Sequence, residues 1–176
     1  RQSAAAAVGT VVHRMLETLV LDRDLDDQIE TARARLTEDV ASELGPDELS
    51  RAVDRLGGLL DVISTGRCLA RLAELAPSVV ARELDVVARP PTDDGTSVVS
   101  GAVDLVYTDP EDGRLVIADY KTDTVGTEAE IAERCGRYQP QLETYGRALE
   151  KALGLDHPPH LELWFLSVDR VVRLVD

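Results

Sequence analysis

The sequence predicts a single α+β domain, and three observations lead to this fold class. Apolar residues recur at helical spacing through the first 76 positions. After Pro77 they form short strand-like runs, with a turn signal from Asp109 to Gly113. One long helical stretch then interrupts the strands, which gives helices followed by β-β-β-α-β-β. We therefore expect residues 1–176 to form one domain, with a helical region over 1–76 and a core over 77–176.

Four helices are expected in the helical region. The first spans 3–21, with Ser3 as its N-cap. The second spans 25–44 and stops at Gly45, and Pro46 opens the third, which runs through Ile63. The fourth spans 67–75 and ends before Pro77. In each of the three longer helices the apolar residues lie three or four positions apart, which predicts one buried face.

Five strands and one long helix are expected in the core. The strands 79–87, 97–107 and 115–121 form a β-meander. The helix spans 127–153, and we expect an interruption near 136–140, where glycine and proline occur. The strands 160–167 and 171–175 complete the chain. No internal repeat, low-complexity tract or domain linker is visible.

Composition limits the possible functions. The chain is 44% hydrophobic and 30% charged, as in soluble globular proteins, and no apolar run approaches the length of a membrane span. The net charge of −14 argues against a free-standing nucleic-acid-binding protein, which normally carries a basic patch. Ten acidic residues and three arginines between Asp22 and Ser50 supply half of this charge, which is typical of a solvated helical face.

The cysteines indicate a redox compartment, and the first residue suggests that the chain is part of a longer protein. Cys68 and Cys135 are too few for a four-cysteine metal site. We expect free thiols in a reducing compartment, the cytoplasm. No signal peptide is visible, and the chain begins at Arg1 rather than Met, so we expect a module cut from a longer protein.

Polar residues follow the buried strand 115–118 at Asp119-Tyr120-Lys121. Side chains alternate along a strand, so Asp119 and Lys121 share one face and Tyr120 takes the other. An acid and an amine at this position can hold a metal beside a reacting phosphate. Taken alone, such a pair is more often a solvated ion pair that contributes little to stability.

Two further acids lie within apolar strands. Asp104 is flanked by apolar residues on the preceding strand, and we expect it diagonally across from Asp119, about 7–8 Å away. The two carboxylates can share one divalent cation, because Mg²⁺ prefers carboxylate oxygens. Glu83, on the first strand, can bind the metal directly, bind it through water, or pair with Arg82.

Other candidates lie on helices. His13 lies at the edge of the first helix's apolar face, one turn after Gly9. A glycine inside a helix costs about 1 kcal/mol relative to alanine, which suggests close approach of another backbone or a ligand. On the long helix, Gln141 and Tyr145 share a face. Tyr138 and Arg134 extend this stripe, whose side chains can bind phosphate and sugar oxygens or form an ordinary helix edge.

These elements occur in a definite order along the chain. The order is Gly9-Thr-Val-Val-His13, Glu83, Gly101-Ala-Val-Asp104, Asp119-Tyr-Lys121-Thr-Asp123 and Gln141-Leu-Glu-Thr-Tyr145. This set resembles the PD-(D/E)xK nuclease superfamily, and most closely the C-terminal nuclease domain of the RecB/AddA helicase–nucleases of bacterial double-strand-break repair. The resemblance implies a restriction-endonuclease-like core and covers nearly the whole chain, although residues 25–75 match no motif.

The resemblance implies roles for individual residues. His13, Asp104, Asp119 and the carbonyl of Tyr120 would bind Mg²⁺ or its substitute Mn²⁺, with Glu83 assisting. Lys121 would activate the attacking water and stabilise developing charge. The four polar residues of the long helix, Arg134, Tyr138, Gln141 and Tyr145, would line the site near DNA.

The resemblance also implies a setting. The expected reaction is exonucleolytic cleavage of single-stranded DNA, and the expected partner is a helicase motor in cis or on a separate chain. The sequence lacks the four cysteines of one branch of the superfamily, so no iron–sulfur cluster is expected. Two alternatives remain: a degenerate nuclease fold that only holds DNA, and an unrelated metal-dependent hydrolase.

Overall fold

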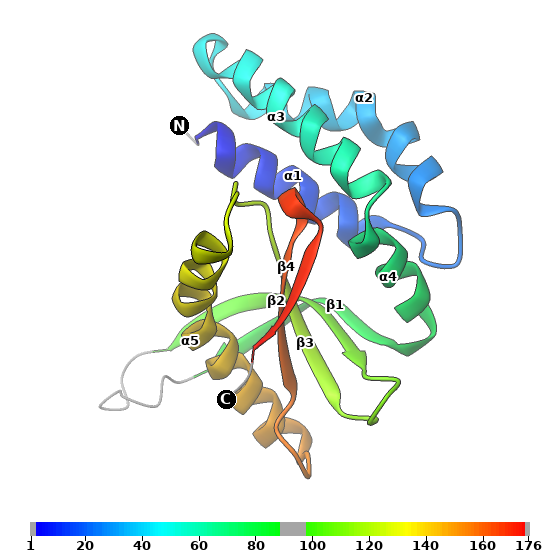
Figure 1. The fold of residues 1–176 in the computed structure, drawn as a ribbon, viewed down its shortest axis with the longest axis vertical. Coiled ribbons are helices and arrows are strands. Elements are labelled where there is room, and N and C mark those ends of the chain that lie inside the picture. Colours follow the sequence, from blue (N-terminus) through cyan, green and yellow to red (C-terminus); the bar gives the residue numbers. More distant parts are fainter. Residues whose placement is uncertain (1–2, 89–97, 175–176) are drawn as a thin grey trace. The chain divides into compact units, whose positions relative to one another are not determined.

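The computed structural model describes residues 3–88 and 98–174 (Figure 1). The helices are α1 (Ala4–Thr18), α2 (Leu25–Glu43), α3 (Pro46–Ser64), α4 (Arg67–Leu75) and α5 (Glu128–Leu153), with short 3₁₀ turns η1 (Ala76–Ser78) and η2 (Leu166–Val168). The strands are β1 (Val79–Ala88), β2 (Val99–Thr108), β3 (Leu115–Lys121), β4 (His160–Phe165) and β5 (Arg170–Leu174). The predicted α+β order, with an N-terminal helical region, is confirmed. Within the described ranges, no helix has the length and apolarity to cross a membrane.

The chain forms two compact units, each with its own packing. The first comprises Arg1–Ala76, Tyr120–Thr124 and Phe165–Arg170, and contains α1 to α4. Helix α1 is capped by the Ser3 hydroxyl, which accepts from the amide of Ala6, and it buries Val8, Val12 and Leu16 on one face. Helix α4 has no side-chain cap of its own. Asp169 supplies the cap instead, because its carboxylate accepts from the amides of Arg67 and Cys68, each at 2.8 Å.

The second unit comprises Pro77–Asp119, Val125–Trp164 and Val171–Asp176. Its sheet has the order β1-β2-β3-β4-β5, and both β1–β2 and β2–β3 are antiparallel. The core of this unit lies between the sheet and α5, because Val103, Val106 and Ile117 pack in one cluster with Tyr145 and Leu149. This packing fixes α5 against the strands that carry the acidic residues.

A buried polar network joins three strands of this second unit. Glu162, only 1% exposed, accepts from the Tyr107 hydroxyl at 2.9 Å and the Trp164 indole at 3.0 Å. Its other oxygen accepts from Arg173 at 2.9 Å, and Arg173 also pairs with Asp109 at 2.8 Å. Burial alone would raise the pKa of Asp109, but hydrogen bonds from the Glu111 amide and Arg173 outweigh it and lower that pKa. The buried carboxylate of Glu162 is tolerated because both of its oxygens accept hydrogen bonds.

The predicted boundaries agree closely with the structure, with one clear difference. The interruption expected near 136–140 is wrong, because α5 is continuous with Pro140 inside it. Proline removes one helical hydrogen bond, but both ends of α5 are fixed: Thr127 and Glu130 form a capping box, and Gly154 adopts the left-handed conformation. The expected ends at residues 97 and 175 lie outside the described residues.

Candidate active site

Three acidic residues lie at the same level on three neighbouring strands. In the β1–β2 register, Arg82 pairs with Leu105 and Leu84 with Val103, so Glu83 lies opposite Asp104. In the β2–β3 register the last pair is Leu105 with Ala118, and the next residues are Asp104 and Asp119. Continued by one residue beyond the paired ladder, this register brings Asp104 opposite Asp119, whereas a diagonal arrangement was expected. Directly opposite residues of an antiparallel pair have β carbons about 4.5–5.5 Å apart.

Strand β1 is irregular near its acidic residue, and its register with β2 shifts between Val79 and Ala81. Glu83 has a φ of 48°, in the left-handed region, which costs a non-glycine residue about 1–2 kcal/mol. Residues three apart pack in the same core cluster on both strands: Ala81 and Leu84 on β1, Val103 and Val106 on β2. A regular strand would point such pairs to opposite faces. The alternation of faces is therefore broken between Ala81 and Leu84 on β1 and between Val103 and Val106 on β2. The left-handed backbone of Glu83 is a departure of the kind that clusters at functional sites.

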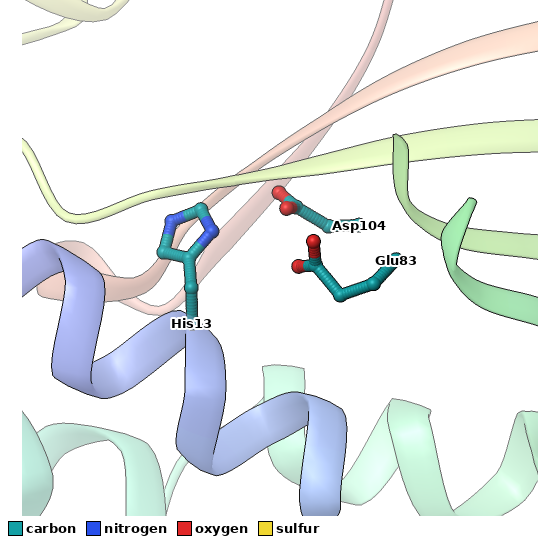
Figure 2. Close-up of side chains that lie close together, drawn as sticks. All are labelled: His13, Glu83 and Asp104. Carbon is teal, nitrogen blue, oxygen red and sulfur yellow. The ribbon is translucent and has the colours of Figure 1, made fainter. Parts of the chain in front are cut away.

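The side chains of Glu83 and Asp104 lie close together (Figure 2). A carboxylate oxygen of Glu83 lies within 4.8 Å of one from Asp104. Asp104 is 6% exposed and Asp119 is 8% exposed, and buried carboxylates are stable only when they are hydrogen-bonded, paired or bound to a metal. Hard divalent cations take such carboxylate oxygens, so these donors fit Mg²⁺ or Mn²⁺. In the described part of the chain, Asp119 does not join Glu83 and Asp104 in a cluster with all oxygens within 4.8 Å.

The first unit carries the other catalytic candidates. His13 projects from α1, as Figure 2 shows, and its ring packs edge-on against Tyr120 with centroids 6.1 Å apart. Lys121 ends β3, two residues after Asp119. Gly9 lies one turn before His13, and a β carbon there would be 3.2 Å from the hydroxyl oxygen of Thr122. The close approach expected at Gly9 is thus a contact with the segment that follows Lys121.

Helix α5 carries the remaining candidates. The side-chain amide of the exposed residue Gln141 donates to the hydroxyl of Tyr145 at 3.0 Å. Tyr145 is 1% exposed, and its ring belongs to the core of the second unit. Its hydroxyl lies beside Gly101, where a β carbon would collide with it. Tyr138 and Arg134, both half-buried, lie two and three turns before Tyr145 on the same helix.

Comparison with known proteins decides the family. A family model of the PD-(D/E)XK nuclease superfamily matches residues 1–173. The chain belongs to this superfamily. The resemblance inferred from the ordered motifs is confirmed, and so is the nuclease class of the chain.

Curated relatives share this PD-(D/E)XK region. An ATP-dependent helicase/nuclease subunit of Thermoanaerobacter sp. (strain X514) is 29% identical over 157 residues, which cover 85% of this chain and 12% of the relative. The protein of the same name from Desulforudis audaxviator is 46% identical over 56 residues, 32% of this chain and 4% of the relative. The chain therefore spans about an eighth of the first relative's length.

Sequence reasoning missed one residue that contacts the PD-(D/E)XK motif region. Arg55 of α3 donates to the carbonyl of Thr122 at 2.7 Å and to the hydroxyl of Thr124 at 2.8 Å. It therefore holds the segment immediately after Lys121. No sequence signal distinguished Arg55. Helix α3 matches no motif, and Arg55 resembles any other polar residue of an amphipathic helix.

Proposed function

We propose that this chain is a divalent-metal-dependent deoxyribonuclease that hydrolyses phosphodiester bonds. The observation that carries the proposal is the alignment of Glu83, Asp104 and Asp119 on neighbouring strands, with Lys121 two residues after the last acid. Three oxygen donors at one level suit a hard cation, and an adjacent lysine suits a reaction in which negative charge develops.

Within this proposal each residue has its own role. Asp104 and Asp119 hold Mg²⁺ or Mn²⁺, with His13 and the carbonyl of Tyr120 as further ligands and Glu83 assisting. When bound, the cation would acidify water and neutralise the scissile phosphate. Lys121 orients the attacking water and stabilises the charge that develops on the phosphate. The edge-on packing of the His13 ring against Tyr120 supports a fixed ring orientation.

The polar stripe of α5 is proposed to contact the DNA backbone. Gln141 is exposed and can reach a phosphate or sugar oxygen, whereas Tyr145 is buried and orients the amide of Gln141. Tyr138 and Arg134 extend the contact toward the start of the helix. Such contacts position a strand without reading its sequence.

We further propose that a helicase motor delivers single-stranded DNA to this module for exonucleolytic cleavage, in bacterial double-strand-break repair and recombination. The names of the relatives support an association with a helicase, because they combine helicase and nuclease. Such a protein would work in the cytoplasm, where the chromosome lies. The net charge of −14 suits a tethered module, because high local concentration replaces intrinsic affinity for a polyanion.

A cleavage assay tests the proposal. Labelled single-stranded DNA is incubated with the chain and Mg²⁺, with Mn²⁺, and with excess chelator. We expect acid-soluble products only with metal, and none from Asp104→Ala or Asp119→Ala. Asp85→Ala is the matched control, because Asp85 is an exposed acid two residues from Glu83 on β1. Cleavage that survives chelation, or wild-type rates in Asp119→Ala, would contradict the proposal, and absence of cleavage under all conditions would favour a degenerate fold.

A further inference from the structure

The segment that follows Lys121 is held at two points within the first unit. Arg55 donates to the carbonyl of Thr122 at 2.7 Å and to the hydroxyl of Thr124 at 2.8 Å. The hydroxyl of Ser167, in η2, donates to the carbonyl of Asp123. Three consecutive residues after the proposed catalytic lysine are therefore fixed by side chains from distant parts of the sequence.

A small hollow lies beside this segment. Its volume is about 170 Å³, and its lining includes Arg55, Gly58, Thr122, Thr124 and Ser167. One water molecule takes roughly 30 Å³ in the liquid, so the hollow has room for a phosphate group. Gly58 leaves one side open, because a β carbon at this position would meet no atom within 4 Å.

The hollow offers positive charge and hydrogen-bond donors. The two oxygens that accept from Arg55, a carbonyl and a hydroxyl, are both uncharged, so they do not neutralise its guanidinium. Its Nε is buried, with no hydrogen-bond partner in the described part of the chain. The oxygen of Thr124 accepts from Arg55, which leaves the hydroxyl hydrogen available for another acceptor. The charge of Arg55 and the hydroxyl hydrogen of Thr124 are the groups that an anionic oxygen in the hollow would meet.

We propose that this hollow binds a non-scissile phosphate of the nucleic-acid strand, next to the bond that is cut. The inference rests on the proposed nuclease function, since it takes its ligand from the substrate of that reaction. Thr122 directly follows Lys121, so a phosphate held by Arg55 and Thr124 would contact the segment that begins one residue after the proposed catalytic lysine. The subsite fixes the register of the strand relative to Lys121.

Salt dependence of binding separates this role from a purely structural one. Affinity for a single-stranded oligonucleotide is measured by fluorescence anisotropy at several salt concentrations in a Lys121→Ala background, so that the strand is not cut. Arg55→Gln keeps an amide that can donate to Thr122 but removes the charge. We expect roughly tenfold weaker binding. The slope of log affinity against log salt should be shallower by about 0.7, as for one lost contact with a single strand.

Arg51→Gln is the matched control. Arg51 lies one turn earlier on α3, is exposed, and does not line the hollow. We expect its slope to equal that of the parent. Equal slopes for Arg55→Gln and Arg51→Gln would overturn the subsite. The salt slope measures binding, so it tests the subsite independently of the cleavage assay. A complete lack of DNA binding would also overturn the subsite.

A second pair of variants does not alter Arg55. Gly57 and Gly58 are neighbours on α3, and a β carbon on either would meet nothing within 4 Å, but only Gly58 lines the hollow. Gly58→Asp places a carboxylate at the hollow, and Gly57→Asp makes the same charge change beside it. We expect Gly58→Asp to weaken oligonucleotide binding several-fold more than Gly57→Asp. Equal effects would overturn the proposal.

Discussion

The hydroxyl of Tyr145 fills the space in which a β carbon of residue 101 would lie, so only glycine fits at Gly101. This contact fixes α5 against β2, three residues before Asp104. We expect Gly101→Ala to lower the free energy of unfolding by about 1–3 kcal/mol, because overpacking a core displaces side chains and backbone. Urea denaturation of the variant and the parent measures the difference.

A double-mutant cycle tests whether this hydroxyl is the cause. Tyr145→Phe removes the oxygen that meets the new methyl group, so it should recover part of the stability lost in Gly101→Ala. Additive effects of the two substitutions would show that the contact does not explain the cost.

Gly9→Ala should separate stability from activity. Alanine favours a helix over glycine by about 1 kcal/mol, so α1 gains stability. The new β carbon would lie 3.2 Å from the Thr122 hydroxyl oxygen, which must move, and Thr122 follows Lys121. We expect a variant that is at least as stable as the parent but cleaves DNA several-fold more slowly.

Gly57→Ala provides the comparison for Gly9→Ala. It makes the same change within α3, where a β carbon meets nothing within 4 Å. It should gain stability and keep the parental cleavage rate. A similar loss of rate in both variants would show that the contact between Gly9 and Thr122 is not responsible.

The fold was largely predictable because local signals agree with it. Helix α4 and strand β3 begin and end at the expected residues. A glycine precedes α4 and Pro77 follows it, whereas a turn precedes β3 and polar residues mark its end. The continuity of α5 was not predictable from Pro140 alone, because the caps at both ends outweigh one lost hydrogen bond.

The site residues were predictable only where a charged residue lies within an otherwise apolar strand. Asp104 and Asp119 are conspicuous because each interrupts an apolar strand. The left-handed backbone of Glu83 has no local signal, since glutamate rarely adopts it. The burial of Tyr145 and the hydrogen bonds of Arg55 arise from packing between segments far apart in sequence, which periodicity does not specify.

The cap of α4 makes a pH-dependent contribution to stability. Burial alone would raise the pKa of Asp169, but hydrogen bonds from the amides of Cys68 and Arg67 outweigh it and lower that pKa. A group with a lowered folded-state pKa stabilises the fold above its unfolded pKa, about 3.9, and this stabilisation disappears as the pH falls through the folded value. Asp169→Asn keeps the side-chain oxygen but removes the charge. At pH 7 it should cost about 1 kcal/mol, as expected for an anion at a helix N-terminus.

Denaturant unfolding at several pH values checks this prediction. The difference between the parent and Asp169→Asn should be constant above pH 5 and should vanish once Asp169 is protonated in the folded state. A difference that persists unchanged at low pH would mean that the charge of Asp169 is not what stabilises α4.

Lys121 and Asp119 should have separable roles in the proposed reaction. They lie two residues apart on β3 and share one face of the strand, but a protonated lysine has no lone pair with which to bind a cation. Lys121→Ala should lose most of the cleavage rate and retain metal binding, with tighter affinity because a nearby positive charge is gone. Asp119→Ala should lose cleavage and metal binding together, because it removes a ligand. Calorimetric titration of Mn²⁺ into both variants, beside the cleavage assay, measures each property. Normal cleavage by Lys121→Ala, or loss of metal binding as complete as in Asp119→Ala, would show that the lysine does not have the separate role proposed for it.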